Sequence, residues 1–458
     1  MLSSYNWPGK YRPFAHQVTT TEFLVSNRKS FCFNEAGTGK TACAIWASDF
    51  LLSKKAIRRV LVICPLSIVD AAWRNDLFTF AMHRSCVIAH GTTAQRRKAV
   101  ASGTDYVIIN FDGVGTILPE LLAGGFDLII VDECNSYKNS QIVRYKVLQK
   151  LVAKAKGLWL MTGTPAAQSP TDAYGLAKLV CPDKVPRYFG AFRDMVMYKA
   201  GPFKWLPKAN AQETVFNVLQ PAIRFEKRQC LDLPPITYVD RYAPMTPQQT
   251  EYYKRMKRQG LIAASGEQIT SINAAVMVNK LLQIACGSAY TDDGGVLEFD
   301  ASARLGAMKE IIDETQHKAI VFVPHRHVIA RVYEYLVRDK IKAEVIQGGV
   351  RSATRNDIIR RFQNSPDTKV LVLQPRTTAH GVTLTTADTV IWYTAPLAGV
   401  DTYIQGNARV DRAGQKNPMT VYRLQGSPIE EKMYKALHDN VELHVSTVTL
   451  FRQEIEEE

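Results

Sequence analysis

The sequence predicts an α/β fold made of two parallel-sheet lobes with a mostly helical region between them. Short apolar runs alternate with helical patterns over residues 31–179, and the same alternation returns over residues 319–424. Such alternation is typical of parallel sheets whose strands are joined by helical crossovers. Because 458 residues exceed what one hydrophobic core usually holds, we expect lobes at 1–180 and 301–458 and a separate region at 181–300.

Apolar runs of strand type predict the individual elements of both sheets. In the first lobe they are residues 30–33, 60–63, 106–109, 128–131 and 158–161. In the second lobe they are residues 319–323, 343–346, 370–373, 389–393 and 419–424. The middle region is rich in proline, with helical spacing at 248–262 and 271–285 and an expected extended connector at 233–242.

Residues 34–41 read Asn-Glu-Ala-Gly-Thr-Gly-Lys-Thr, a variant of the phosphate loop. Glycines let backbone amides turn toward phosphate oxygens, Lys40 adds a point charge, and the Thr41 hydroxyl can ligate Mg²⁺. A strand precedes the loop and a helical pattern follows it, which is the context that the motif requires. A chance match in a surface loop is the alternative, and these flanks argue against it. The predicted ATP contacts here are Gly37, Thr38, Gly39, Lys40 and Thr41.

The apolar run at 128–131 ends in two acids, Asp132 and Glu133. Acids often just end strands, so the pair alone is a weak signal. Together with a phosphate loop it predicts that Asp132 holds Mg²⁺, directly or through water, and that Glu133 orients or deprotonates the attacking water.

The run at 158–161 leads into Thr162-Gly163-Thr164-Pro165. This tetrad is compatible with an ordinary turn. Its position after the two preceding motifs favours a relay between the Mg²⁺ site and a bound strand, through Thr162 and Thr164.

A segment beginning at Gln405 contains Arg409 and Arg412, which are three residues apart. This spacing places two side chains on one face of a helix. We expect a helix after Tyr403 to present both arginines across a cleft to the γ-phosphate, where they would stabilise transition-state charge. The alternative is that they pair with a neighbouring aspartate or carbonyl and hold the lobe together.

Bulk properties restrict the class of partner. The formal net charge of +14 and a pI near 9.3 favour a polyanion, although a merely basic soluble protein is the alternative. The eight cysteines include no Cys-x-x-Cys pair, so no zinc site or disulfide framework is indicated and a reducing cytoplasm is expected. No apolar stretch is long enough for a membrane span, and the first ten residues lack the apolar core of a signal peptide.

Taken in order, these motifs resemble the superfamily-two helicases and translocases, in particular the Swi/Snf-like ATPase branch. The matching segments are residues 12–17, 65–67 with Trp73, 132–139, 162–165, 231–235, Arg376 with 381–385, and Gln405, Arg409, Arg412, Gly414 and Gln415. The resemblance implies two RecA-like lobes, with ATP hydrolysed in the cleft between them and directional movement along duplex nucleic acid. It also implies that Gln17 reads adenine. The nucleic-acid contacts that it implies are Pro65, Thr162, Thr164, Arg376 and Gly381.

The chain departs from the family pattern in several places. Cys134 and Asn135 replace a small residue and a histidine after the acids, Gly406 and Ala408 replace an arginine and a glycine, and residues 378–379 replace a glycine pair. These changes bear on strand contacts and rate more than on ATP binding. The short chain suggests a minimal motor of a bacterium or phage, acting in the cytoplasm.

The leading hypothesis is an ATP- and Mg²⁺-dependent translocase on duplex DNA, without sequence preference. A strand-separating DNA or RNA helicase is the first alternative, since RNA is not excluded by any short motif. A catalytically silent nucleic-acid clamp is the alternative from another class. A phosphate-loop kinase ranks lower, because it would not need a second lobe with Arg409 and Arg412.

Overall fold

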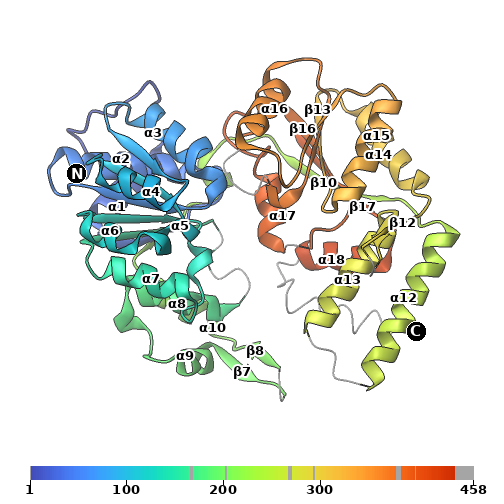
Figure 1. The fold of residues 1–458 in the computed structure, drawn as a ribbon, viewed down its shortest axis with the longest axis horizontal. Coiled ribbons are helices and arrows are strands. Elements are labelled where there is room, and N and C mark those ends of the chain that lie inside the picture. Colours follow the sequence, from blue (N-terminus) through green and yellow to red (C-terminus); the bar gives the residue numbers. More distant parts are fainter. Residues whose placement is uncertain are drawn as a thin grey trace. The chain divides into compact units, whose positions relative to one another are not determined.

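The computed structural model describes residues 2–163, 165, 169–201, 204–266, 271–291, 294–377, 383–397 and 399–438. Within these ranges the chain divides into two compact units, one ending at Asp232 and the other starting at Leu233 (Figure 1). Each unit has its own parallel sheet with helices around it, which confirms the predicted α/β fold with two parallel-sheet lobes.

Unit 1 is built on a seven-stranded parallel sheet in the order β3-β4-β2-β5-β6-β1-β9. Its strands are β1 (Lys29–Cys32), β2 (Val60–Cys64), β3 (Cys86–Ala89), β4 (Tyr106–Asn110), β5 (Leu128–Asp132), β6 (Gly157–Met161) and β9 (Ala222–Ile223). All five strands predicted for this lobe are present. Strands β3 and β9 are additional, and both lie at the edges of the sheet.

Helices surround this sheet, so its central strands are buried on both faces (Figure 1). The helices are α1 (Ala15–Ser26), α2 (Lys40–Ser53), α3 (Asn75–Phe80), α4 (Thr93–Ala101), α5 (Phe111–Thr116), α6 (Leu118–Ala123), α7 (Val143–Val152), α8 (Ala173–Val180), α9 (Phe189–Val196), α10 (Ala211–Val218) and α11 (Lys227–Cys230). Alternate residues of β2 enter different cores: Leu61 and Ile63 pack into one, and Val60 and Val62 into the other. A continuous apolar run is what a strand covered on both faces requires.

Unit 2 has a six-stranded parallel sheet in the order β10-β17-β16-β13-β15-β14. Its strands are β10 (Ile236–Tyr242), β13 (Lys318–Phe322), β14 (Ala343–Ile346), β15 (Val370–Leu373), β16 (Ala387–Trp392) and β17 (Met419–Gln425). Its helices are α12 (Pro247–Gly266), α13 (Ser271–Ala285), α14 (Ser302–Glu314), α15 (Arg326–Arg338), α16 (Ser352–Asn364), α17 (Val400–Asn407) and α18 (Pro428–His438). The five strands and two helices predicted from residue 248 onward are all present.

The segment 233–242 is extended as expected, and most of it forms a strand of the second sheet, β10. β10 pairs in parallel with β17 over seven residues, from Ile236 opposite Met419 to Tyr242 opposite Gln425. β10 lies at the edge of the sheet, so only one of its sides pairs with another strand. Its residues do not alternate regularly between buried and exposed. That weak alternation explains why the segment has no clear strand signal in the sequence.

The region 181–300 contributes to both compact units, because the boundary between them falls at Asp232 and Leu233. Two small antiparallel hairpins occur in it: β7 (Met197–Lys199) with β8 (Trp205–Pro207) in unit 1, and β11 (Ser288–Tyr290) with β12 (Val296–Glu298) in unit 2. Among the described helices, none combines the length and apolar character that crossing a membrane requires.

Candidate nucleotide-binding site

The phosphate loop joins the end of β1 to the start of α2, as the sequence predicts. Gly37 and Gly39 have φ values of 89° and 86°, in the left-handed region that favours glycine. A side chain at Gly39 would also clash, since its Cβ would lie 2.4 Å from Nε2 of Gln17. The two glycines therefore serve the backbone path of the loop and the close approach of α1.

Lys40 points back into this loop. Its Nζ donates hydrogen bonds to the carbonyl oxygens of Asn34 at 2.8 Å and Glu35 at 3.2 Å. The Thr38 hydroxyl donates to the same Glu35 carbonyl at 2.8 Å. The loop is thus closed on itself around a cation, next to the N-terminal end of a 14-residue helix, and both features favour an anion at this position.

Gln17 lies in α1 and contacts the loop backbone. Its Nε2 donates to the Thr38 carbonyl at 3.1 Å, and its Oε1 accepts from the Phe14 amide at 3.0 Å. The His16 ring nitrogen Nε2 lies 2.9 Å from the same Thr38 carbonyl oxygen. His16 lies in the segment 12–17 but was not expected to contact the loop, although its position next to Gln17 is a usable signal. The reading of adenine by Gln17 stays a prediction, and its observed partner is the loop itself.

A segment distant in sequence also binds the phosphate loop. The Phe225 amide donates to Asn34 Oδ1 at 2.9 Å, and the Glu35 amide donates to the Phe225 carbonyl at 3.0 Å. The Lys227 amide donates to the Glu35 carboxylate at 3.0 Å. Asn34 and Glu35 are therefore fixed by hydrogen bonds to residues about 190 positions later in the sequence. No local sequence pattern could have identified this contact.

The two acids stand where β5 ends. Asp132 is 6% exposed, and its two carboxylate oxygens have separate donors: Oδ1 accepts from the Glu133 amide at 3.0 Å and Oδ2 from Trp73 Nε1 at 2.9 Å. Burial, reinforced by the neighbouring charge of Glu133, raises the pKa of Asp132 to about 6, while the charge of Lys40 acts in the opposite direction. Asp132 and Cys32, the last residue of β1 before the phosphate loop, pair with the same residue, Met161 of β6, so the acids and the loop follow the same end of the sheet.

Glu133 has an unusual backbone conformation. Its φ and ψ are both 53°, the left-handed region that non-glycine residues rarely adopt. Such strain persists where the surroundings impose it, and it is common at functional sites. It turns the chain sharply between β5 and the short helix at Cys134–Tyr137.

The oxygen ligands available here suit magnesium. A carboxylate at Asp132 and a hydroxyl at Thr41 are hard oxygen donors, the type that Mg²⁺ prefers when phosphates complete its shell. The residues present therefore fit a Mg²⁺–nucleotide complex.

The predicted relay lies against the same loop. The Thr162 amide donates to the Cys32 carbonyl at 3.1 Å, and Thr162 is buried. A Cβ placed on Gly163 would lie 3.3 Å from the Ala36 nitrogen and 3.6 Å from Lys40 Nζ. Thr162 and Gly163, the first two residues of the tetrad, thus lie beside the phosphate loop.

Of the other predicted nucleic-acid contacts, the structure describes the positions of only two, Pro65 and Arg376. Pro65 directly follows β2, and the next residue, Leu66, is 55% exposed. Arg376 lies in the short helical turn Pro375–Thr377. Thr164 and Gly381 lie outside the described residues. None of the five contacts is tested by these positions.

The predicted placement of Arg409 and Arg412 on one helix face is wrong. Helix α17 contains Tyr403 and Gln405 but ends at Asn407, and turns follow it. The Arg409 carbonyl accepts the Leu384 amide at 2.8 Å, so it is used by another segment instead of continuing the helix. Arg409 is buried, whereas Arg412 is half-buried. Their action on a phosphate stays a prediction.

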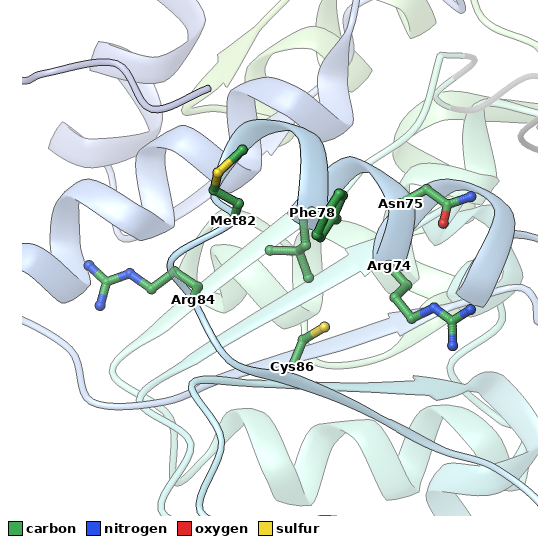
Figure 2. Close-up of a pocket in the computed structure, with 7 residues that line it drawn as sticks. Arg74, Asn75, Phe78, Met82, Arg84 and Cys86 are labelled. Carbon is green, nitrogen blue, oxygen red and sulfur yellow. The ribbon is translucent and has the colours of Figure 1, made fainter. Parts of the chain in front are cut away.

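A surface hollow of about 270 Å³ lies elsewhere on unit 1 (Figure 2). Figure 2 shows Arg74 and Arg84 on opposite sides of it, with Phe78 and Met82 between them. Its lining residues are Arg74, Asn75, Leu77, Phe78, Met82, Arg84 and Cys86, none of which belongs to the phosphate loop.

Comparisons with known proteins match two domain families to consecutive parts of the chain. The SNF2-related domain family matches residues 16–288, and the helicase conserved C-terminal domain matches residues 303–414. The mouse protein "Chromodomain-helicase-DNA-binding protein 1-like" is 25% identical over 90% of the chain and 47% of its own length. An ATP-dependent helicase of Mycoplasma genitalium is 24% identical over 91% of the chain and 40% of its own length.

Among solved structures, the Sulfolobus solfataricus SWI2/SNF2 ATPase core in complex with dsDNA is 23% identical. The match covers 94% of this chain and 92% of that one, with a TM-score of 0.47. The chain spans less than half the length of the two curated relatives named above. Because the SNF2-related domain family matches more than half of the residues and the helicase C-terminal domain follows it in order, the chain belongs to the SNF2-related, Swi/Snf-like branch of the superfamily-two ATPases.

Proposed function

We propose that this protein hydrolyses ATP with Mg²⁺ and uses the energy to move along duplex DNA without sequence preference. The observation that carries the proposal is that the phosphate loop and the buried carboxylate of Asp132 follow the same end of one sheet, since Cys32 of β1 and Asp132 of β5 both pair with Met161 of β6. Membership of the SNF2-related family supports the same activity, and the net charge of +14 supports a polyanionic partner.

Each residue of this site has a defined task in the proposed reaction. The loop amides and Lys40 bind the β- and γ-phosphates, and Asp132 with Thr41 would hold the metal. A bound Mg²⁺ would neutralise negative charge on the phosphates. Glu133 orients the attacking water and accepts its proton. Buried Asp132 needs no reorganisation because two donors already fix its carboxylate.

The decisive experiment compares ATPase rates without polymer and with single-stranded DNA, duplex DNA or RNA. Selective stimulation by duplex DNA is the result that we expect of a translocase. Equal or greater stimulation by RNA or by single strands would contradict the proposed substrate.

A strand-displacement assay on forked and blunt duplexes separates translocation from unwinding. We expect hydrolysis without release of a strand. Release of a strand in proportion to ATP consumed would establish the helicase alternative. Absence of hydrolysis with every polymer, despite DNA binding, would establish the silent clamp.

A further inference from the structure

A single hydrogen bond links the metal-site carboxylate to a segment on the other side of strand β2. Trp73 Nε1 donates to Asp132 Oδ2 at 2.9 Å, across 59 positions of sequence. The Trp73 side chain is fully buried and Asp132 nearly so. A hydrogen bond to a charged acceptor in such surroundings is stronger than one between neutral groups.

A π-helical turn around Trp73 accounts for the direction in which its side chain points. Residues Val69–Arg74 form a π-helical turn, which continues directly into α3. A π-turn inserts an additional residue into a helix and so changes the direction in which the side chains point, and such turns occur frequently at functional sites. Here the turn sends the Trp73 ring into the core next to β5.

The same segment has a second, solvent-facing side. It begins at Pro65, directly after β2, and Leu66 is 55% exposed. Arg74 and Asn75, which follow Trp73, line the surface hollow of unit 1 (Figure 2). The segment 65–74 therefore contacts the metal-site carboxylate at one position while neighbouring positions face solvent.

The second oxygen of Asp132 shows what this bond adds. Oδ1 is held by the amide of the next residue, a bond that the backbone conformation of Glu133 supplies. That bond alone leaves rotation of the carboxylate about it possible. Trp73 holds Oδ2 and so fixes the plane of the group, leaving the remaining lone pairs of both oxygens for other ligands.

We propose that Trp73 is a positioning residue that orients the metal-holding carboxylate of Asp132 and links it to the segment 65–74. The proposal rests on the proposed function, because it takes Asp132 as the Mg²⁺ ligand.

The test removes the N–H donor while an aromatic ring stays at position 73. In Trp73→Phe we expect the Mg²⁺ concentration that half-saturates binding of a fluorescent N-methylanthraniloyl-ADP to rise about 10- to 100-fold, the usual effect of losing a partner of a metal ligand. Trp159→Phe is the matched control. Trp159 is equally buried in unit 1, but its Nε1 donates to the Asn27 carbonyl at 3.1 Å, away from the acids. The control should keep the wild-type Mg²⁺ requirement.

Asp132→Asn separates failure of this inference from failure of the proposed function. If Asp132→Asn abolishes the Mg²⁺ dependence of nucleotide binding and Trp73→Phe leaves it at the wild-type value, Trp73 is not a positioning residue. If Asp132→Asn also leaves it unchanged, the assignment of Asp132 as metal ligand fails first. Should Trp73→Phe unfold below the melting temperature of Trp159→Phe, β-(3-benzothienyl)alanine at position 73 provides an isosteric ring without the N–H, and the same shift is expected.

Discussion

Lys40 Nζ lies 2.8 Å from the backbone carbonyl oxygen of Asn34 and donates a hydrogen bond to it within the phosphate loop. The same ammonium reaches the Glu35 carbonyl at 3.2 Å. Asn34 and Glu35 also form hydrogen bonds with the backbone of Phe225, which is distant in sequence. The cation is thus bound by acceptors that phosphate oxygens can replace with stronger, charge-assisted bonds.

Lys40→Ala is expected to abolish productive ATP binding. No other lysine lies in the loop, and its charge is the one placed to meet the β- and γ-phosphates. Titration with a fluorescent ATP analogue measures the loss. Lys54→Ala, which alters the residue just after the other end of α2, is the control and should bind normally. Wild-type affinity and turnover in Lys40→Ala would refute the assignment of the loop.

Glu133→Gln should keep ATP bound while hydrolysis stops. The amide has nearly the same size as the carboxylate but cannot accept the proton of the attacking water. Asp132 remains to hold the metal, so Mg²⁺-dependent affinity should stay near that of the wild type. Single-turnover hydrolysis and ATP binding are measured on the same preparation. If tight binding disappears with the hydrolysis, Glu133 has a structural role at its strained turn.

Mg²⁺-dependent nucleotide affinity should decrease as the pH falls from 7 to 5. Burial raises the pKa of Asp132 to about 6, so its carboxylate takes up a proton in this window and no longer offers a charged ligand. Calorimetric titration at several pH values checks this, with titrations in EDTA as the control. A metal-dependent affinity that is constant down to pH 5 would contradict the expectation.

The raised pKa of Asp132 has the opposite effect on folding stability, which should increase as the pH falls. The folded protein binds this proton more tightly than the unfolded chain, because its pKa is raised above the ordinary aspartate value. Nucleotide-free wild type should therefore gain stability relative to Asp132→Asn as the pH falls from 7 toward 5. Melting temperatures of the two proteins across this range provide the measurement.

DNA binding should be non-specific and steeply dependent on salt. The chain carries 57 lysines and arginines against 43 acids, and its sequence contains no zinc-finger or recognition-helix pattern. The logarithm of the affinity should decrease linearly with the logarithm of salt concentration, with a slope of about 0.9 per phosphate contact. Anisotropy titrations on several duplexes of unrelated sequence test this. A strong preference for one sequence at physiological salt would count against it.

The parts of the molecule that local pattern determines could be predicted from the sequence. Strands such as β2 and β5 are continuous apolar runs because helices cover both of their faces. The phosphate loop and the acids could be assigned because their chemistry depends on a few residues at fixed spacing. The fold class and the main strands follow from these signals.

Contacts between distant segments could not be predicted in this way. The bond from Phe225 to Asn34 spans 191 positions and uses a backbone amide, which carries no residue-specific signal. Trp73 belongs to a motif that the sequence shows, but its hydrogen bond to Asp132 involves a π-helical turn that sequence spacing does not reveal. The turn after α17 likewise contains a contact with a distant segment, because the Leu384 amide donates to the Arg409 carbonyl.

Arg409 and Arg412 remain the predicted source of transition-state stabilisation, although they do not share a helix face. If they act on the γ-phosphate, alanine at either position should leave the fold and ATP affinity largely intact. Turnover should fall by a factor on the order of 10³ or more, and duplex DNA should no longer stimulate it. Their sites in turns differ in burial, so Arg409→Ala is expected to cost more stability than Arg412→Ala.

Arg423→Ala is the control for a structural arginine in the same unit. Arg423 forms an ion pair with Asp240 at 2.7 Å and joins β17 to β10. Its loss should lower the melting temperature while turnover per folded molecule stays at the wild-type value. Rates are therefore divided by the folded fraction, measured by circular dichroism at the assay temperature. If Arg409→Ala and Arg412→Ala behave like Arg423→Ala, both arginines hold the unit together and another group must stabilise the charge that grows on the γ-phosphate.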